Sequence, residues 1–458
     1  MDHRARATSS DQSAAHQDNG VPSCIDTGGR RFCLVEQWRI DVRRDGFASL
    51  RGTTTELNMD RSFWRSGHTP TLFSAFLYFD LSFMVWYLLG PLQIQIAKTL
   101  ELSTQQRALM VATPILAGAL LRLPMGMLAD RIGAKRAGLL GQIVVIAALF
   151  GAWRVGIHSM AQALVFGALL GVAGASFAVA LPLASRWYPP QHQGTAMGIA
   201  GAGNSGTVLA ALFAPALAVA LGWQNVFGIA CLPLAGALVI YVFCAKDAPV
   251  PSQHKHLRDY ARMLANRDAW WFMFFYALTF GGFSGFASSL PGYFHDQFAF
   301  DPKTAGYATA ACVFAGSVMR PFGGLLADRI GGTRSLLTVY GAVAALIGTS
   351  GFSAGAPAVS LALFIVAMLC LGMGNGAVFQ LVPQRFAKDI GVMTGLVGMA
   401  GGVGGFALAA SLGAIKQATG FYSAGLWLFA CLVALGWLGL SNVKRRWRAS
   451  WTGATARV

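Results

Sequence analysis

The feature that most constrains the fold of this chain is a series of apolar runs that begins near Thr69 and recurs almost to the C-terminus. Each run is about 20 residues long, the length of helix that crosses the hydrocarbon core of a bilayer. Backbone groups in lipid must satisfy one another, so these runs are expected to be α-helices. We predict an all-α membrane protein with twelve transmembrane helices, at residues 70–96, 106–129, 135–155, 160–186, 194–220, 223–244, 269–293, 303–327, 333–354, 358–385, 391–416 and 421–441.

The charged residues support this prediction by their scarcity and by their placement. They make up 12% of the chain, against about 25% in an ordinary soluble domain. A net charge of +16 would suit a nucleic-acid partner, but the first 58 residues carry eight basic and eight acidic residues, which cancel. The other 27 basic residues lie mainly in short loops. The basic residues therefore indicate how the chain is oriented in the membrane, and we expect it to contact lipid and not nucleic acid.

The loop charges also predict the orientation of the chain. Basic residues concentrate in the even-numbered connections, such as Arg131, Lys135 and Arg136, and after residue 442. Cytoplasmic loops carry this excess, so both termini are expected on the cytoplasmic side of the inner (plasma) membrane. The predicted parts are a first six-helix half (59–244), a cytoplasmic linker (245–268), a second half (269–442) and a basic cytoplasmic tail (443–458).

Residues 1–58 differ from the rest, because they are polar and lack any apolar period. Two interpretations remain open for them: a disordered tail, or a start assigned too early. We favour the second, because Met59 opens a run that leads directly into the first span.

Two stretches of sequence repeat between the halves at an offset of 198 residues. LAGALLRLPMGMLADRIGAKR begins at Leu116, and FAGSVMRPFGGLLADRIGGTR begins at Phe314. A second match joins GVAGASFAVALP, from Gly171, to GMGNGAVFQLVP, from Gly372. Many carriers are built from such repeats, with the substrate site near the bilayer midplane between them. The repeat therefore predicts two pseudo-symmetric six-helix bundles around a central site.

The repeated loops resemble the G-x-L-A-D-R-x-G-x-[KR] signature of the major facilitator superfamily. This resemblance implies the major facilitator fold and a gating role for both loops, in which the Asp caps a helix and pairs with a cation across the interface. The bland alternative is a loop that merely stops a helix. The implied gating residues are Gly126, Asp130, Arg131 and Gly133 in the first copy and Asp328, Arg329 and Gly331 in the second.

Arg122 and Arg320 occupy equivalent positions of the repeat, about two turns before each loop. Placing a charged side chain at that depth in the membrane costs free energy, so each such residue is a candidate functional residue. Two guanidinium groups facing one cavity call for an anion, and their planar donors suit an oxyanion. The alternative is that each arginine pairs with backbone carbonyls or with an acid.

Two further spans are dense in glycine, with GIAGAGNSGTVLAA from Gly198 and GLVGMAGGVGGFALAA from Gly395. A glycine costs about 1 kcal/mol in a helix relative to alanine, so this density has a cause. Ordinary close packing of membrane helices is one explanation. The other is that backbones approach a small ligand and slide as the halves move.

These segments resemble the glycine-rich signature of the nitrate/nitrite porter family, and the runs GMGNGAVFQLVPQRF and FWRSGHTPTLFSAFLYFDLSFMVWYLLGP are also similar to bacterial members. The resemblance covers residues 59–442. It implies that Arg122 and Arg320 grip the anion and that Asn204 is a polar contact. It further implies an aromatic clamp, although aromatic residues in such spans are more often core. The implied clamp and signature glycines are Tyr276, Phe280, Phe83 or Trp86, and Gly201, Gly203, Gly206, Gly401, Gly404 and Gly405.

Nitrate uptake runs against a negative-inside potential, at a cost of about 2.3 kcal/mol per 100 mV. Proton symport and nitrate/nitrite antiport would each supply the energy. Symport needs a titratable group, and Asp80 is the only carboxylate within a predicted span. It is our candidate proton carrier. The alternative is a helix-end Asp in contact with water or a loop cation.

Two other functions were weighed. A carrier for another small anion, such as a carboxylate, would use the same arginines. A membrane sensor or enzyme would need a catalytic or signalling motif, and the chain has no GxSxG, HExxH or P-loop sequence. Its seven cysteines lack metal-ligand spacing. We therefore expect a monomeric transporter rather than an enzyme, without cofactor or metal.

Overall fold

The structure, a computed structural model, describes residues 24–27, 30–35, 38–41, 61–249, 256–353, 355–386 and 389–450. It divides into two compact units, Met1–Asp60 and Arg61–Val458. In the smaller unit β1 (Cys24–Thr27), β2 (Arg30–Val35) and β3 (Trp38–Asp41) form an antiparallel sheet in that order. The sequence analysis did not predict this sheet. The rest of residues 1–58 lies outside the described residues, so the choice between a tail and an early start remains a prediction.

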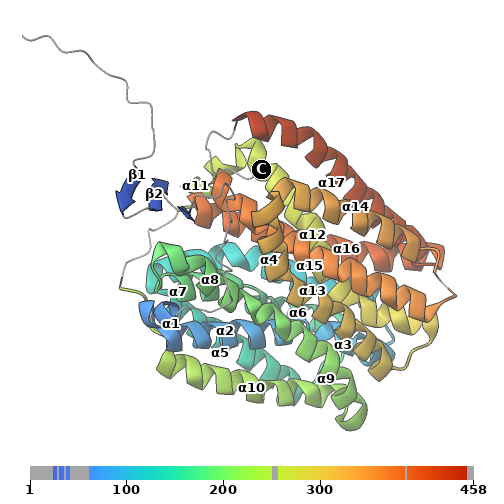
Figure 1. The fold of residues 1–458 in the computed structure, drawn as a ribbon. Helices are drawn as coiled ribbons and strands as arrows, with labels where there is room; N and C mark the ends of the chain where they lie inside the picture. The colour runs from blue at the N-terminus through green and yellow to red at the C-terminus, as the bar shows by residue number, and fades with distance from the viewer. Residues whose placement is uncertain are drawn as a thin grey trace, which may run out of the picture. The chain divides into compact units, whose positions relative to one another are not determined.

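The larger unit places helices at all twelve predicted spans, and this confirms the fold class (Figure 1). The first half contains α2 (Thr69–Trp86), α3 (Leu89–Thr99), α4 (Thr104–Ile132), α5 (Ala134–Val155), α6 (Met160–Gly174), α7 (Phe177–Ser185), α8 (Pro190–Gly201), the 3-10 helix η1 (Ala202–Ser205), α9 (Gly206–Leu221) and α10 (Trp223–Cys244). The second half contains α12 (Arg267–Phe298), α13 (Pro302–Ile330), α14 (Gly332–Ser350), α15 (Pro357–Arg385), α16 (Ile390–Thr419) and α17 (Ser423–Ser450). Short helices α1 (Arg61–Ser66) and α11 (Leu257–Leu264) lie outside the spans.

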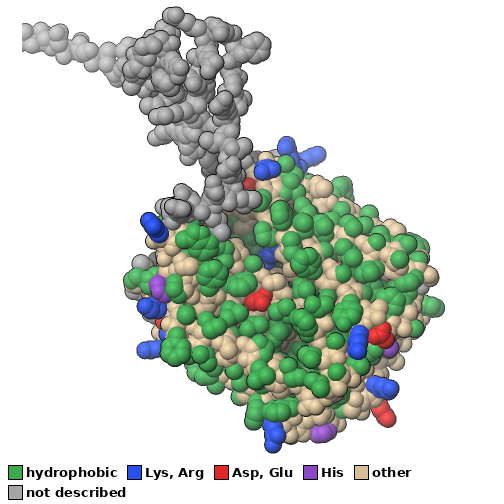
Figure 2. Space-filling model, turned by 60° about the horizontal axis from the view of Figure 1, so that its bottom comes forward, with side chains coloured by type: hydrophobic (Ala, Val, Ile, Leu, Met, Phe, Trp, Pro, Cys, Tyr) green, Lys and Arg blue, Asp and Glu red, His purple; other side chains and the backbone are tan. Residues whose placement is uncertain are grey.

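The surface of the larger unit fits a lipid environment. Within the described residues, ten segments are long and apolar enough to cross a membrane by themselves, and α12 and α14 occupy the two remaining predicted places. Large apolar side chains face outward, such as Leu232 and Phe243 of α10, which are 72% and 76% exposed. Figure 2 shows most charged side chains around the edge of one face, whose middle is mainly hydrophobic and uncharged apart from an acidic and a basic group near its centre. A multi-pass membrane protein accounts for this pattern.

The internal repeat is visible in the backbone of the two ADRIG turns. Both α4 and α13 have 29 residues, and each ends at a glycine with a φ of +94°, Gly133 and Gly331 respectively. Glycine adopts this region readily, whereas other residues rarely do. The same glycines precede α5 and α14. The halves thus turn in the same way at equivalent positions.

The first half has three interrupted helices, and their second-half counterparts are continuous. The first predicted span breaks between Trp86 and Leu89, the fourth between Gly174 and Phe177, and the fifth at η1. Discontinuous helices in membrane proteins occur where backbone or side chains face a binding cavity rather than lipid. The halves contact each other through α4 on α16, α3 on α12 and α9 on α13.

The predicted tail begins as a continuation of α17, which extends to Ser450. Trp447 is buried, stacks on Phe272 with centroids 5.0 Å apart, and donates a 2.9 Å hydrogen bond to Asp268. Asp268 also accepts from Arg385 Nε at 2.8 Å and pairs with Arg446. One buried carboxylate therefore ties together the ends of α12, α15 and α17. Residues 451–458 lie outside the described residues.

We expect Asp268→Asn to destabilise the second half. The substitution removes the charge that both arginines share, and hydrogen bonds to charged groups contribute about 1.5–3 kcal/mol each. The apparent melting temperature of the detergent-solubilised protein should therefore fall. Asp389→Asn is the matched control, because that carboxylate is exposed and makes no side-chain capping bond to α16. Equal melting temperatures for the two variants would contradict the assignment.

Candidate functional site

Arg122 lies on α4 and is 3% exposed. Its Nη1 donates to the backbone carbonyl of Gly398 on α16, in the opposite half. Its Nε and Nη2 atoms are buried and have no hydrogen-bond partner among the described residues. The carbonyl alternative is thus realised for only one of the donors. A buried cation with unmatched donors is costly unless something else stabilises it.

Arg320 occupies the equivalent place on α13. Its Nη2 donates to the Tyr276 hydroxyl at 3.3 Å, and its buried Nη1 has no partner among the described residues. In the part of the chain that the structure describes, no carboxylate pairs with Arg122 or Arg320. Both guanidinium groups contact the stacked pair of Tyr276 and Phe280, Arg320 through the Tyr276 hydroxyl and Arg122 through the Phe280 ring. The pair therefore presents positive charge and free donors without an internal anion.

Three aromatic rings lie around the Arg122 guanidinium group, and one lies against that of Arg320. The Arg122 Cζ lies 5.1 Å from the Phe177 ring centroid, 5.3 Å from that of Phe280 and 5.7 Å from that of Trp86. The Arg320 Cζ lies 5.7 Å from the Phe379 ring centroid. Cation–π contacts of this kind stabilise a desolvated cation by about 2 kcal/mol. The rings offset part of the cost of burial without neutralising the charge.

The structure brings most of the predicted clamp to the arginines. Tyr276 and Phe280 of α12 stack with centroids 5.2 Å apart; Tyr276 contacts Arg320, and Phe280 contacts Arg122. Trp86 touches Arg122 and is held by a 2.7 Å bond from its Nε1 to the Pro114 carbonyl. Phe83 packs edge-on against Trp86, with centroids 4.7 Å apart, and so lies behind the clamp.

Sequence reasoning missed Phe177 and Phe379. They come from opposite halves, and their ring centroids lie 6.3 Å apart. Both belong to the second repeated motif, in the stretches that begin at Gly171 and Gly372. The repetition of this motif could have marked the two residues as functional, but its apolar residues are also typical of an ordinary protein core. The contact between the halves becomes visible only in three dimensions.

Most of the predicted signature glycines allow close helix contacts. A Cβ on Gly401 would lie 2.6 Å from the Tyr276 ring, and Gly404 and Gly405 lie against Ala277 and Ser284 of α12. In the first half, Gly203 and Gly206 contact Phe79 and Asp80 of α2. Gly201 differs, because nothing lies within 4 Å of its added Cβ. The glycines therefore bring the clamp helix α12 and the carbonyl-bearing helix α16 into backbone contact.

Asn204 and Asp80 lie at the edge of this arrangement. Asn204 is 2% exposed, and its Oδ1 has no partner among the described residues. Its element, η1, packs against α2 and against α13, which carries Arg320. Asp80 is 8% exposed and accepts a 2.7 Å hydrogen bond from the Ser205 hydroxyl. Asn375 of α15 also has a buried, unpartnered Oδ1, and sequence reasoning missed it.

The first predicted gating loop is tied to its own half and to the linker. Asp130 pairs with Arg186 Nη2 at 3.2 Å, and this ion pair stays within the first half. Burial and the nearby Asp130 raise the pKa of Tyr260 on α11, which places the linker helix beside the loop. Asp247 of the linker accepts a 2.8 Å bond from the Lys135 backbone and so caps α5.

The other predicted gating residues have less confined positions. A Cβ added to Gly126 would lie 3.8 Å from the Cβ of Ala178, an ordinary van der Waals contact. Arg131, Asp328 and Arg329 are exposed. Among the described residues, no group of His, Cys, Asp and Glu could hold a metal ion. The site therefore offers the chemistry of two guanidinium groups, which can bind a small anion through several N–H donors.

Comparison with known proteins places this geometry in context. A family model described as Major Facilitator Superfamily matches residues 75–409. The chain is 32% identical to "Nitrite extrusion protein" of Bacillus subtilis over 363 residues, which cover 79% of this chain and 88% of that protein. It is 36% identical to "Probable nitrate/nitrite transporter NarK2" of Mycobacterium tuberculosis over 333 residues, 71% and 84% of the two chains.

A third relative is "Probable nitrate/nitrite antiporter NarK1" of Thermus thermophilus, 29% identical over 414 residues, which cover 83% and 93% of the two chains. Among solved structures, a bacterial homolog of the human lysosomal transporter Spinster, in an inward-facing and unoccupied conformation, matches with a TM-score of 0.66. That match covers 86% of this chain and 100% of the other at 17% identity, so it supports the fold alone.

We expect Gly401→Ala to disturb the clamp, because the new methyl group would meet the Tyr276 and Phe280 rings at 2.6 and 3.0 Å. Overpacking of this kind costs about 1–3 kcal/mol, so the apparent melting temperature should fall. Gly201→Ala is the matched control, because it adds the same methyl group where nothing lies within 4 Å. The packing account would be wrong if both variants melted at the wild-type temperature.

Proposed function

Because the chain belongs to the major facilitator superfamily, we propose that it carries nitrate and nitrite across the inner membrane by alternating access. One observation carries this proposal. Arg122 and Arg320 come from equivalent positions in the two halves, three aromatic rings lie around Arg122, and Phe379 and Tyr276 contact Arg320. No carboxylate pairs with either arginine among the described residues. Relatives named as nitrate or nitrite transporters support the choice of anion.

The shape of the site suits a small planar oxyanion. Arg122 offers Nε and Nη2, and Arg320 offers Nη1, as donors without partners among the described residues. Nitrate and nitrite each present oxygens in one plane, which a guanidinium fork can meet with parallel hydrogen bonds. The tight contact between α12 and α16 at Gly401 and Gly404 limits the space beside the clamp. A large substrate would need these helices to separate.

Alternating access requires that the central site open to one side at a time. The halves are tied together at the ends of α4 and α12 that lie away from the ADRIG loops, through Arg107 and Asp296. Beside the loop end of α4 lies a cavity of about 320 Å³, lined by Leu123, Pro124, Met127, Leu128 and Arg131. The ion pair therefore closes the end away from the ADRIG loops, which is the outer side if, as the loop charges predict, these loops face the cytoplasm.

Two coupling modes are compatible with the site. In exchange, the arginines would resist crossing a closed, water-poor state without an anion, because bare charges in a low dielectric are costly. The Thermus thermophilus relative is named as an antiporter, which favours this mode. In symport, a proton would travel with the anion, and Asp80, buried beside Ser205, is the candidate carrier.

A second candidate substrate is another small anion, such as a short carboxylate, because its oxygens would meet the same donors. Competition in proteoliposomes separates the two candidates. If nitrate is the substrate, unlabelled nitrate and nitrite should suppress labelled nitrate uptake, and formate or acetate at equal concentration should not.

We expect Arg122→Lys and Arg320→Lys to lower nitrate transport by about 10- to 100-fold, the effect of losing one charge-assisted hydrogen bond. Lysine keeps the charge but cannot present a planar fork. Uptake of labelled nitrate into proteoliposomes measures the loss. Arg154→Lys is the matched control, because Arg154 is exposed and lies against Trp153. Transport at the wild-type rate by both central variants would refute the site.

Asp80→Asn tests the coupling mode, because it keeps the shape and the contact with Ser205 but cannot release a proton. Under proton symport, an inward proton gradient should no longer accelerate nitrate uptake, and counterflow of nitrate against nitrite should continue. If the variant still responds fully to the gradient, Asp80 is not the proton carrier. If neither protein responds, exchange is the coupling mode.

A further inference from the structure

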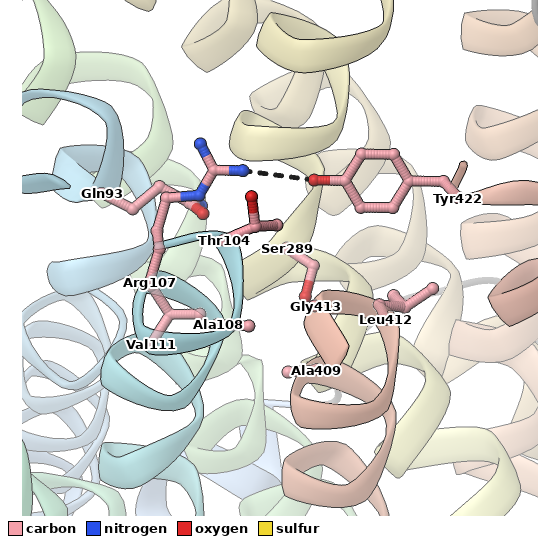
Figure 3. A pocket seen from close by; sticks show the side chains of 10 residues that line it. All are labelled: Gln93, Thr104, Arg107, Ala108, Val111, Ser289, Ala409, Leu412, Gly413 and Tyr422. Atoms are coloured by element: carbon pink, nitrogen blue, oxygen red, sulfur yellow. Dashed lines mark hydrogen bonds between the residues drawn. The ribbon is translucent and has the colours of Figure 1, made fainter. Parts of the chain in front are cut away.

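A second arginine system lies on α4 away from the central site. Arg107 and Asp296 form a two-pronged ion pair, in which Arg107 Nη1 donates to Asp296 Oδ1 at 3.0 Å and Nη2 donates to Oδ2. The Tyr422 hydroxyl donates to Asp296 at 2.8 Å. The same hydroxyl accepts from Arg107 at 3.3 Å (Figure 3). The Arg107 and Asp296 side chains are only 11% and 17% exposed. This cluster plays no part in the central clamp.

The cluster joins the two halves of the protein. Arg107 belongs to the first half, and Asp296 and Tyr422 belong to the second. Nearby, Gln93 Nε2 donates to the Ser288 carbonyl at 2.9 Å, which is another bond between the halves. Fifteen residues separate Arg107 from Arg122 on α4, a distance of about 22 Å along a helix. When the halves separate at this end, the ion pair must break.

A small cavity lined by both polar and apolar residues adjoins the ion pair. Its volume is about 10 Å³, and Figure 3 shows Gln93, Thr104, Arg107, Ser289 and Tyr422 among its lining residues. The Ser289 hydroxyl is buried and has no partner among the described residues. A volume of about 10–15 Å³ holds a single water molecule, so nitrate does not fit while the halves are closed. Room for an anion arises only when Asp296 withdraws.

The carboxylate of Asp296 and nitrate can bind Arg107 in the same way. Both are planar oxyanions with one negative charge, and both can accept two parallel hydrogen bonds from a guanidinium group. A second cation, Lys416, lies 5.2 Å from the Tyr422 ring centroid. Once Asp296 has withdrawn, Arg107, Tyr422 and Ser289 would offer donors to an incoming anion on the path to the central site.

We propose that Arg107 is an outer capture residue for the transported anion, and that Asp296 occupies its guanidinium as an internal substitute while this end is closed. The inference rests on the proposed transport of a small oxyanion. It adds that external anion and Asp296 compete for the same donors, so that arrival of substrate favours opening. The buried charge of Arg107 is then matched in both states, first by Asp296 and then by the anion.

The test measures how often this end opens and whether nitrate protects it. Ser289→Cys places a thiol in the cavity, and its rate of reaction with a membrane-impermeant thiosulfonate, above that of the parent chain, reports opening. Asp296→Asn should raise this rate about tenfold, because Arg107 loses a charged acceptor. Asp301→Asn is the matched control, since Asp301 is an exposed carboxylate at the start of α13. It should leave the rate unchanged.

Nitrate should then slow the labelling of the Asp296→Asn protein, and adding Arg107→Gln should abolish that protection without restoring slow labelling. Arg122→Lys should leave the protection intact, since the central site is separate. Protection that disappears with Arg122→Lys, or that survives Arg107→Gln, would overturn the capture role. A labelling rate that Asp296→Asn leaves unchanged would overturn the closing role.

Two outcomes separate this inference from the proposed function. If nitrate does not protect the Asp296→Asn protein although the parent chain transports nitrate, only the capture role is refuted. If nitrate protects the Asp296→Asn protein but the parent chain does not transport nitrate, only the carrier assignment is refuted. Should Asp296→Asn fail to yield monodisperse protein, Tyr422→Phe removes the hydroxyl that contacts both partners. It should raise the labelling rate by a smaller factor, and no rise at all would count against the inference.

Discussion

The arrangement of the larger unit depends on two positive charges inside the helical bundle, the buried Arg122 and the partly buried Arg320, which no described carboxylate matches. Arg122 and Arg320 lie in a region whose other groups are mostly apolar, and none of the described carboxylates pairs with them. Such charges are among the costliest features of a membrane protein. Three aromatic rings around Arg122 and one carbonyl, that of Gly398, reduce the cost but leave donors free. A bound anion would match them, and this links the stability of the site to its occupancy.

The two halves form the walls of this site in different ways. The first half interrupts its helices near Trp86, Phe177 and Asn204, so that side chains and short backbone segments turn toward the interior. The second half keeps continuous helices and relies on glycine at Gly401, Gly404 and Gly405 to bring α16 against α12. The repeat therefore supplies a symmetric pair of arginines within an asymmetric wall, and asymmetry of this kind lets the halves move differently around one ligand.

The sequence predicted well what depends on local chemistry. Apolar run length predicted the twelve spans, and the repeat predicted the equivalent turns at Gly133 and Gly331. Depth in the membrane identified Arg122 and Arg320. The sequence did not reveal features that depend on tertiary contact, because run length and composition do not report which faces meet. Phe177 and Phe379 looked like core, Gly201 and Gly401 looked alike, and Arg107 showed no sign of its distant partner Asp296. The sheet of β1, β2 and β3 was also missed, since its strands are only four to six residues long and β3 alone alternates apolar and polar residues.

The central claim is that a single anion bridges the arginines of the two halves. An experimental structure of the full chain determined in nitrate, beside one determined without it, tests this most directly. The account predicts density for one planar anion in contact with Arg122 and Arg320, flanked by Tyr276 and Phe280. Density for nitrate elsewhere, with both guanidinium groups held by protein atoms alone, would contradict it.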